Sequence, residues 1–527
     1  MTGTLAALFR LAGAAYVLAR EGAFGLADPA DLPATPRAAI RIARLFERRG
    51  ISAADRGERL TAAVNRLGPS YVKLGQFLAT RPDLIGQEGA QALGKLRDEI
   101  APFSDAEARA SVARALGKPV EDLFQSFSEP IAAASIAQVH KAELATAEGR
   151  SRTVAVKVLR PGIRRRFRDD LDTFYAAARL IERIDPRSRR LRPVAVVDTL
   201  WRSVQVEMDL RLEAAALSEM AELTAGDQGF RVPTVEWQLT ARDVLTLDWV
   251  EGVKLSDVDA LKAAGHDLPL IARRLMQAFL RQALRDGFFH ADMHQGNFFV
   301  DSAGDIVAID FGIMGRLGKP ERRYLAEILY GFIRRDYARI AQVHFTAGYV
   351  PDTHAVEDFA QALRAVGEPI HGQSAADISM ARLLALLFEV TEIFDMQTRP
   401  ELLMVQKTMV VVEGVCRTLD AKFDMWSAAE PVVADWIERF LGPAGQMELA
   451  ADGIGALGRL AAELPRLAER AERLSAEMDR MAEKGIRLDP ETISGIGQSE
   501  ARGGRWGRIA LVVIAVVAVA AGVKLLF

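Results

Sequence analysis

The chain has 527 residues, of which 50% are hydrophobic and 26% are charged. That length exceeds one ordinary domain, and the composition is typical of a globular protein. The net charge of -3 is close to balance, which argues against a nucleic-acid-binding surface. The single cysteine, Cys416, excludes an internal disulfide and any metal cluster built from cysteines.

The N-terminal part of the chain is predicted to be helical. Leucines recur among arginines near the N-terminus, without the small-residue cleavage site of a signal peptide. They predict an amphipathic helix that either packs on the protein or contacts a membrane surface. A proline-rich linker over 28–36 and a helix over 38–49 should follow. A further helix over 72–79 would place Lys73 and Gln76 on one face, which composition alone predicts to be solvated.

The segment from Pro130 to Lys141 stands where a first strand and turn are expected, yet it is rich in alanine and lacks turn glycines. The next apolar alternation, Thr153 to Leu159, predicts a strand that carries Lys157. A lysine within Val-Ala-Val-Lys commonly brings its ammonium group to the α- and β-phosphates of a nucleotide. The alternative is a solvated lysine on an edge strand, and the residues further along the chain favour the nucleotide role.

A lysine in that role needs a carboxylate from a helix to hold it. The helix predicted around Val206 to Leu217 offers Glu207, Asp209 and Glu213. Glu207 and Glu213 lie about 240° apart around a helix, so they should have different partners. Glu207 and Asp209 would share a partner only if the helix begins or distorts at that point.

Two further features precede the most informative stretch. Arginines crowd the segment from Arg160 to Arg192, which is either a solvated face or a contact for anionic lipid headgroups. Val244 to Leu255 is predicted to be a strand that ends in a turn at Glu251 and Gly252. We expect a hinge between two lobes here, with backbone groups that would meet an adenine.

The most informative stretch runs from Gly287 to Gly312. Two short apolar runs flank a turn-rich pentapeptide and predict a hairpin, with Asn297 and Asp310 at one end. Magnesium takes one or two carboxylates beside phosphate oxygens, so these two residues are candidate metal ligands. Asp292 lies five residues before Asn297 and eighteen before Asp310. This is the spacing of a protein-kinase active site, in which Asp292 would orient or deprotonate the attacking hydroxyl.

Beyond Gly312 the chain is predicted to be helical to about Leu441, forming the body of a large lobe. The G-x-G-x-x-G run at 453–458 follows no predicted strand, so we do not interpret it as a nucleotide site. A heptad stripe over 457–481 either packs on the chain's own helices or pairs two chains into a homodimer. A long apolar run preceded by arginines predicts a transmembrane helix over 508–527, with the large domain on the cytoplasmic side.

These motifs together resemble the UbiB-type atypical kinase family, over roughly residues 67–441. The resemblance implies a regulatory element in which an N-terminal K-x-G-Q motif meets an E-x-D motif over the active site. The residues of this element are Lys73, Gly75, Gln76, Glu207 and Asp209.

The family also has an alanine-rich loop in place of the glycine-rich loop of ordinary kinases. The nucleotide-binding residues that this implies are Ala132, Ala133, Ala134, Ser135, Ile136, Ala137, Gln138 and Val139, together with Lys157 and Glu213. Glu213 is the carboxylate left to pair with Lys157. Met293 and Gln295 depart from the family's H-A-D-P-H-P-G-N loop, where both positions are proline, whereas Asp292 and Asn297 are kept.

The resemblance implies an α+β, protein-kinase-like fold of two lobes that is predominantly helical. The expected parts are an N-terminal helical extension (1–120), an N-lobe (121–252), a C-lobe (253–445), an amphipathic helical segment (446–500) and the transmembrane helix. Expected cofactors are ATP and Mg²⁺. The implied function is an atypical kinase or ATPase that supports ubiquinone biosynthesis at the inner membrane, assisting the aerobic hydroxylation steps.

Expected partners of such a protein are membrane lipids, ubiquinone precursors and the enzymes that process them, and no nucleic acid. A competing hypothesis is a non-catalytic membrane organiser of these enzymes, for which the nucleotide is only a conformational ligand. A small-molecule phosphotransferase of the antibiotic-kinase type is a third hypothesis, against which the K-x-G-Q motif and the membrane segment argue.

Overall fold

The computed structural model describes residues 2–23, 42–48, 56–79, 101–145, 151–184, 192–371 and 399–441, with short pieces within 85–96 and 389–396. The predicted proline-rich linker, G-x-G-x-x-G run, heptad stripe and transmembrane helix over 508–527 lie outside the described residues. Within them, no helix is both long enough and apolar enough to cross a membrane.

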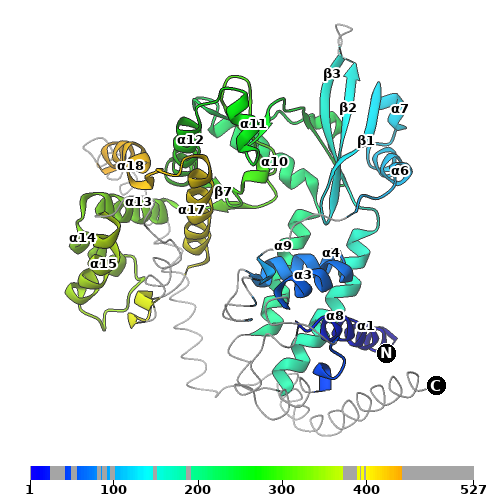
Figure 1. Ribbon diagram of the computed structural model, residues 1–527, viewed down its shortest axis with the longest axis horizontal. Helices are drawn as coiled ribbons and strands as arrows, with labels where there is room; N and C mark the ends of the chain where they lie inside the picture. The colour runs from blue at the N-terminus through cyan, green and yellow to red at the C-terminus, as the bar shows by residue number, and fades with distance from the viewer. Residues whose placement is uncertain are drawn as a thin grey trace, which may run out of the picture. The chain divides into compact units, whose positions relative to one another are not determined.

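The N-terminal half of the described chain combines helices with one sheet (Figure 1). The helices are α1 (Thr2–Arg20), α3 (Arg56–Leu67), α4 (Pro69–Ala79), α6 (Asp105–Leu116), α7 (Val120–Leu123), α8 (Ile163–Ile184), α9 (Pro193–Glu207) and α10 (Leu210–Leu223). The strands are β1 (Ser126–Ala133), β2 (Ala137–Ala145), β3 (Ser151–Leu159) and β5 (Val244–Asp248), which form an antiparallel sheet in the order β1-β2-β3-β5. The alanine-rich segment is therefore a strand and a turn, as predicted.

The alternation of β3 decides where Lys157 points. Val154, Val156 and Val158 are fully buried and pack in one hydrophobic cluster with residues of α6 and α7. Successive side chains of a strand face opposite sides of the sheet, so Lys157 points away from this cluster. The face that it occupies is the one where α10 presents Glu213.

One predicted helix proves to be two helices separated by a capping residue. We expected a helix through Val206 to Leu217, which is wrong: α9 ends at Glu207 and α10 begins at Leu210. Asp209 stands between them as the N-cap residue, and its side chain accepts a hydrogen bond from the backbone N–H of Arg211. An aspartate at this position satisfies a backbone donor of the new helix and so favours a break over continuation. The angular argument from a continuous helix therefore does not apply.

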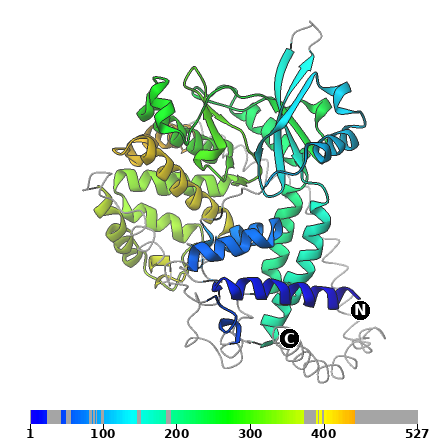
Figure 2. The same cartoon turned by 45° about the vertical axis from the view of Figure 1, so that its right-hand side comes forward.

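In the N-terminal extension, α1 packs against α8 and α3 (Figure 2). It buries Ala7, Ala14 and Ala19 and leaves Phe9 and Tyr16 exposed. The buried face of this helix thus packs on the protein, which was one of the two expectations. Contact of the exposed face with a membrane stays a prediction.

The segment that we predicted to be one strand ending in the hinge is split between two sheets. β5 ends at Asp248, whereas Val253–Lys254 forms β6, which pairs with β8 in a second sheet ordered β4-β9-β8-β6. The other strands of that sheet are β4 (Phe230–Arg231), β8 (Phe298–Val300) and β9 (Ile306–Ala308). The antiparallel pair β8–β9 is the hairpin that the sequence predicted. The chain crosses from the first sheet to the second between Asp248 and Val253.

The C-lobe is mainly helical, as expected. Its elements are α11 (Val258–Ala263), α12 (Leu268–Leu280), the π-helix η5 (Arg281–Asp286), β7 (Phe288–His290), η6 (Gln295–Asn297), β10 (Met314–Arg316), α13 (Lys319–Arg334), α14 (Tyr337–Thr346), α15 (Val356–His371), α17 (Pro400–Leu419) and α18 (Met425–Leu441). The hydrophobic helix α12 packs against α17, and α14 packs between α13 and α15. β7 and β10 pair with each other and flank the loops that carry the predicted catalytic residues.

A buried histidine in the C-lobe gives the fold a testable dependence on pH. His344 lies on α14 against Tyr349 and Phe359, and its Nδ1–H donates to the carbonyl of Ile340 at 2.8 Å. Burial lowers the pKa of His344 from 6.5 to about 4. The unfolded chain therefore takes up this proton at a higher pH than the folded chain, and the free energy of unfolding should fall as the pH drops from 6.5 to about 4.

His344→Asn keeps a donor for Ile340 but cannot titrate. We expect the melting temperature of this variant to fall less than that of the wild type when the pH is lowered through this range. Some dependence should remain, because burial also lowers the pKa of His140 and His290. Melting curves with the same pH slope in both proteins would contradict the assignment to His344.

Candidate active site

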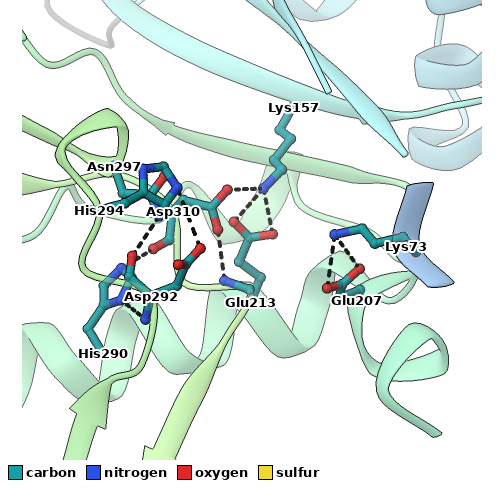
Figure 3. Close-up of polar contacts among 10 residues, drawn as sticks. Lys73, Lys157, Glu207, Glu213, His290, Asp292, His294, Asn297 and Asp310 are labelled. Atoms are coloured by element: carbon teal, nitrogen blue, oxygen red, sulfur yellow. Dashed lines mark hydrogen bonds and ion pairs between the residues drawn. The ribbon is translucent and has the colours of Figure 1, made fainter. Parts of the chain in front are cut away.

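A lysine and two carboxylates from three separate elements meet at the centre of the site (Figure 3). Lys157 Nζ, on β3, lies 2.7 and 3.0 Å from the two carboxylate oxygens of Glu213, on α10. The same nitrogen lies 3.2 Å from Asp310 Oδ2, in the segment that follows β9. The structure thus contains the pairing of Lys157 with Glu213 that the sequence analysis expected, and adds Asp310 to it.

The two carboxylates of this triad differ in their surroundings. The side chain of Glu213 is 7% exposed, and burial and the neighbouring charge of Asp310 raise its pKa although Lys157 opposes the shift. The side chain of Asp310 is 43% exposed. Its partial burial is outweighed by Lys157 and by the backbone N–H of Gly312, which hold the pKa of Asp310 well below its usual range. Asp310 is therefore the ionised carboxylate on the open side of the triad.

Lys157 itself is held in the charged form. Burial disfavours the ammonium group, but the charges of Asp310 and Glu213 outweigh that effect and raise the pKa of Lys157 above its ordinary value. A buried ammonium between two carboxylates remains a cation at neutral pH.

The loop after β7 brings Asp292 and Asn297 together. Asn297 Nδ2 donates to the backbone carbonyl of Asp292 at 3.0 Å. The short helix η6 provides the turn between them, and it is capped by His294, whose Nδ1 accepts from the backbone N–H of Gly296. The carboxylate of Asp292 is 39% exposed and lies 3.5 Å from His294 Nε2. It is thus open to a substrate hydroxyl.

His290, which the sequence analysis did not single out, joins this loop to Asp310. Its Nε2–H donates to the backbone carbonyl of Asp310 at 2.6 Å, and its Nδ1 accepts from the backbone N–H of Asp292 at 3.1 Å. This arrangement requires the neutral ring, and burial lowers the pKa of His290 accordingly. Its position two residues before Asp292, the predicted base, is the feature of the sequence that would have indicated its role.

Buried contacts from the C-lobe hold the loop in place. Met293, one of the two residues that replace a proline of the family pattern, is fully buried. Thr408 on α17 donates through Oγ1 to the carbonyl of Ala291 at 3.1 Å. Phe311 is also buried and packs beside the ring of His290, with centroids 5.3 Å apart. The loop is therefore supported by packing although both prolines are missing.

The K-x-G-Q element meets the end of α9. Lys73 Nζ, on α4, lies 3.1 and 3.0 Å from the two carboxylate oxygens of Glu207, and both side chains are largely buried. A Cβ atom at Gly75 would lie 2.5 Å from Leu96 Cδ1, so glycine allows α4 to pack closely there. Gln76 is half-buried on the same helix.

Asp209 has partners of its own. Besides capping α10, it pairs with Arg211 at 2.7 Å and with Arg242 at 3.7 Å. Hydrogen bonding to Arg211 is the main reason why the pKa of Asp209 lies below its usual range. Glu207 and Asp209 therefore act separately: one receives Lys73, and the other starts the helix that carries Glu213.

The alanine-rich loop, residues 132–139, comprises the end of β1, the turn over 134–136 and the start of β2. The backbone N–H of Ala134 donates to the carbonyl of Ala137 at 2.8 Å, and Val139 lies opposite Lys157 in the sheet. Ser135 and the side chain of Gln138 are buried, whereas Ala132 is exposed. The strand that leaves this turn pairs with the strand of Lys157, whereas the side chain of Gln138 is directed into the protein.

Comparison with known proteins now identifies the family. Residues 95–344 match the ABC1 atypical kinase-like domain, and residues 363–424 match the UbiB helical domain. The chain is 39% identical over 421 residues to the probable protein kinase UbiB of Marinobacter nauticus, covering 79% of this chain and 76% of that protein. It belongs to the UbiB family of atypical kinase-like proteins.

Other proteins that are similar to this chain support the same family. The probable protein kinase UbiB of Xanthomonas campestris pv. campestris is 39% identical over 439 residues, which cover 81% of this chain and 79% of that protein. Among solved structures, the complex of Rv3197 with erythromycin from Mycobacterium tuberculosis matches with a TM-score of 0.50 and 25% identity, over 72% of this chain and 96% of that chain. The kinase-like, mostly helical fold with small sheets is thereby confirmed, while the transmembrane helix stays a prediction.

A UbiB-type kinase-like domain implies ATP binding, and the residues at the site fit a magnesium ion beside the phosphates. The amide nitrogen of Asn297 donates to the backbone carbonyl of Asp292, so its side-chain oxygen is the candidate metal ligand. Asp310 is ionised and half open, and two carboxylates surround a single ammonium group. Among the described residues no cluster of three or more His, Cys, Asp or Glu side chains is suited to a metal. A site of few protein ligands completed by phosphate oxygens is the arrangement that Mg²⁺ prefers.

Glu213→Gln should impair the site with little change in size. The amide cannot balance the charge of Lys157, so the ammonium group should shift toward Asp310 and away from the phosphates. We expect a loss of ATP turnover of about 100-fold, as for the removal of one preorganised electrostatic contact.

Glu219→Gln is a matched control for that variant, because Glu219 lies on the same helix in a more exposed pair with Arg316. The rates of ATP hydrolysis by the two variants are compared at equal fractions of folded protein. Equal rates for Glu213→Gln and Glu219→Gln would contradict the role of Glu213 in holding Lys157.

Proposed function

We propose that this protein binds ATP with Mg²⁺ and acts as an atypical kinase or ATPase that supports ubiquinone biosynthesis. The observation that carries the proposal is the triad of Lys157, Glu213 and Asp310, next to a loop in which Asp292 and Asn297 are joined by a hydrogen bond. Phosphoryl transfer needs little covalent chemistry from the protein and depends on positioning and charge neutralisation. A fixed ammonium group, an exposed carboxylate and two oxygen ligands are the groups that such a reaction uses.

Each residue has a role in this proposal. Lys157 would contact the α- and β-phosphates while Glu213 keeps it in position. Asn297 and Asp310 would hold Mg²⁺, which when bound neutralises charge on the phosphates. Asp292 would orient the attacking hydroxyl or water and accept its proton, while neutral His290 keeps the backbone of Asp292 aligned with that of Asp310.

The K-x-G-Q extension bears on the identity of the acceptor. The Lys73–Glu207 pair attaches α4 to the end of α9, two residues before the cap of α10. A folded segment fastened beside the site leaves less room for a protein substrate than for a small molecule. We therefore favour water or a small lipid-like acceptor over a protein side chain.

The biological role rests on the family. Relatives that are 39% identical carry the description of a probable protein kinase UbiB, and the family resemblance implies a part in ubiquinone biosynthesis. We propose that the protein works at the cytoplasmic face of the inner membrane, with ubiquinone precursors and their enzymes as partners, and assists the aerobic hydroxylation steps. The predicted membrane segment over 508–527 is the feature of the chain that supports this location.

The test is ATP hydrolysis by the purified protein with Mg²⁺, with and without liposomes of anionic lipid. Asp292→Asn should lower the turnover number by at least about 100-fold, the usual effect of losing a general base, while the dissociation constant for ATP stays near that of the wild type. Asp305→Asn is the control, because Asp305 lies in the turn of the neighbouring hairpin and pairs with Arg274 at 3.6 Å.

Three outcomes of this experiment are informative. Hydrolysis that requires Asp292 supports the enzyme. Unchanged turnover in Asp292→Asn would refute the proposed role of that residue. Wild-type protein that binds ATP but never hydrolyses it would instead favour the nucleotide-gated membrane organiser.

The proposed location has its own test. Removal of residues 508–527 should transfer the protein from the membrane fraction to the soluble fraction, while ATP turnover without liposomes is retained. A truncated protein that stays in the membrane fraction would contradict the proposed anchor. It would direct attention to other surfaces, such as the exposed side of α1 with Phe9 and Tyr16.

A further inference from the structure

The short segment Ala101–Phe103 lies between the K-x-G-Q extension and the N-lobe. Before it, Leu96 packs in the hydrophobic cluster of the extension with residues of α3 and α4. After it, Ser104 caps α6, which packs under the N-lobe sheet. The segment is therefore the covalent link from the K-x-G-Q extension to the N-lobe.

Gln138 of the alanine-rich loop binds this link from one side. The backbone N–H of Phe103 donates to Gln138 Oε1 at 3.0 Å. Gln138 Nε2 in turn donates to His140 Nε2 at 2.9 Å, and His140 Nδ1–H donates to the carbonyl of Ser128 on β1 at 2.8 Å. The side chains of Gln138 and His140 are both buried, so the chain of hydrogen bonds is shielded from water. It runs from the link, through β2, to β1.

Arg160 binds the same link from the other side. Its Nη2 donates to the carbonyl of Ala101 at 2.9 Å and lies 3.5 Å from the carbonyl of Ala134, in the turn of the alanine-rich loop. Its guanidinium group also stacks over the ring of Phe103, 5.2 Å from the centroid. The backbone N–H of Arg160 donates to the carbonyl of Ile136 at 2.7 Å. One residue at the end of β3 thus contacts both the link and the turn.

The turn needs such support because its own strand ladder is irregular. The pairing of β1 with β2 shifts register on both sides of Pro130. Proline has no backbone N–H to donate, so the ladder is interrupted just before the loop. Side chains from β2 and β3 therefore supply the contacts that regular strand pairing does not provide.

We infer that Gln138 and Arg160 are positioning residues, which fasten the turn Ala134–Ala137 to the link Ala101–Phe103 and so preset the loop for the phosphates of the nucleotide. This inference rests on the proposed nucleotide binding, and it goes beyond it by coupling the extension mechanically to the loop. A loop that is already ordered loses less conformational entropy when it binds a ligand than a loose one.

Arg160→Met and Gln138→Met test the inference, because each removes the polar contacts and keeps an unbranched side chain. Arg152→Met is the matched control: Arg152 lies at the other end of β3, in exposed ion pairs with Glu236 and Asp248. Three measurements are made on all four full-length proteins. They are backbone hydrogen exchange of residues 132–137 without nucleotide, the dissociation constant for ADP with Mg²⁺, and the steady-state kinetics of ATP hydrolysis.

Both test variants should exchange faster over residues 132–137 and bind ADP about tenfold more weakly, the order expected for the loss of hydrogen bonds that involve a charged or buried group. In steady-state hydrolysis the KM for ATP should rise while kcat changes less than about twofold, since Asp292 and Lys157 are untouched. A general loss of stability would lower the folded fraction and kcat together, which this split distinguishes. The control should match the wild type in every measurement.

The inference and the proposed function fail in different ways. Unchanged exchange of the loop in Arg160→Met, with ADP still bound by the wild type, would overturn the inference and leave the function standing. Faster exchange without any change in ADP affinity would also overturn it, because the loop would then not be preset for the nucleotide. A wild-type protein that binds no nucleotide would refute the proposed function, whatever the exchange measurements gave.

Discussion

The whole site depends on one buried ammonium group. Lys157 is almost enclosed, and a charge in that position is stable only if carboxylates and good geometry compensate for lost hydration. Glu213 and Asp310 supply that compensation, and they come from α10 and from the segment after β9. The lysine thereby joins the N-lobe sheet, the helix beside it and the segment of the C-lobe that carries Asp310. Whatever moves one of these elements must change the electrostatics of the other two.

The surrounding structure can be understood as support for this triad. Asp209 caps α10, and because the helix begins at this position, Glu213 in its first turn faces the sheet. His290 ties the backbone of Asp310 to that of Asp292, so that the carboxylate partner of Lys157 and the proposed base share one histidine. The ring is neutral because it both donates and accepts, and burial maintains that state. The polar groups of the site therefore form a connected network from the N-lobe to the catalytic loop.

The N-terminal extension reaches this network at two places. Lys73 binds Glu207, two residues before the cap of α10, while the link after the extension is held against the alanine-rich loop. An ordinary glycine-rich loop is flexible because glycine is permissive, whereas an alanine-rich turn has fewer accessible backbone conformations. In this chain an alanine-rich turn is thus combined with an added segment whose link contacts residues beside that turn.

Local patterns in the sequence were sufficient for the parts of the site that lie close together along the chain. The alternation around Lys157 predicted its strand, and the apolar runs around the turn predicted the β8–β9 hairpin. The spacing of Asp292, Asn297 and Asp310 along the chain was enough to indicate kinase-like chemistry. These predictions succeed because strand periodicity and turn composition are determined by neighbouring residues.

Tertiary structure decided which distant groups meet. The sequence by itself determined the kinase-like motif set and its order and indicated Glu213 as the partner of Lys157, but it did not place Asp310 beside that pair, and it predicted a continuous helix where Asp209 caps a new one. It contained no sign that the strand after Val244 would divide between two sheets, or that Gln138 would turn away from the nucleotide position toward Phe103. Each of these depends on packing between segments far apart in the chain, where burial forces every polar group to find a partner and thereby selects one arrangement.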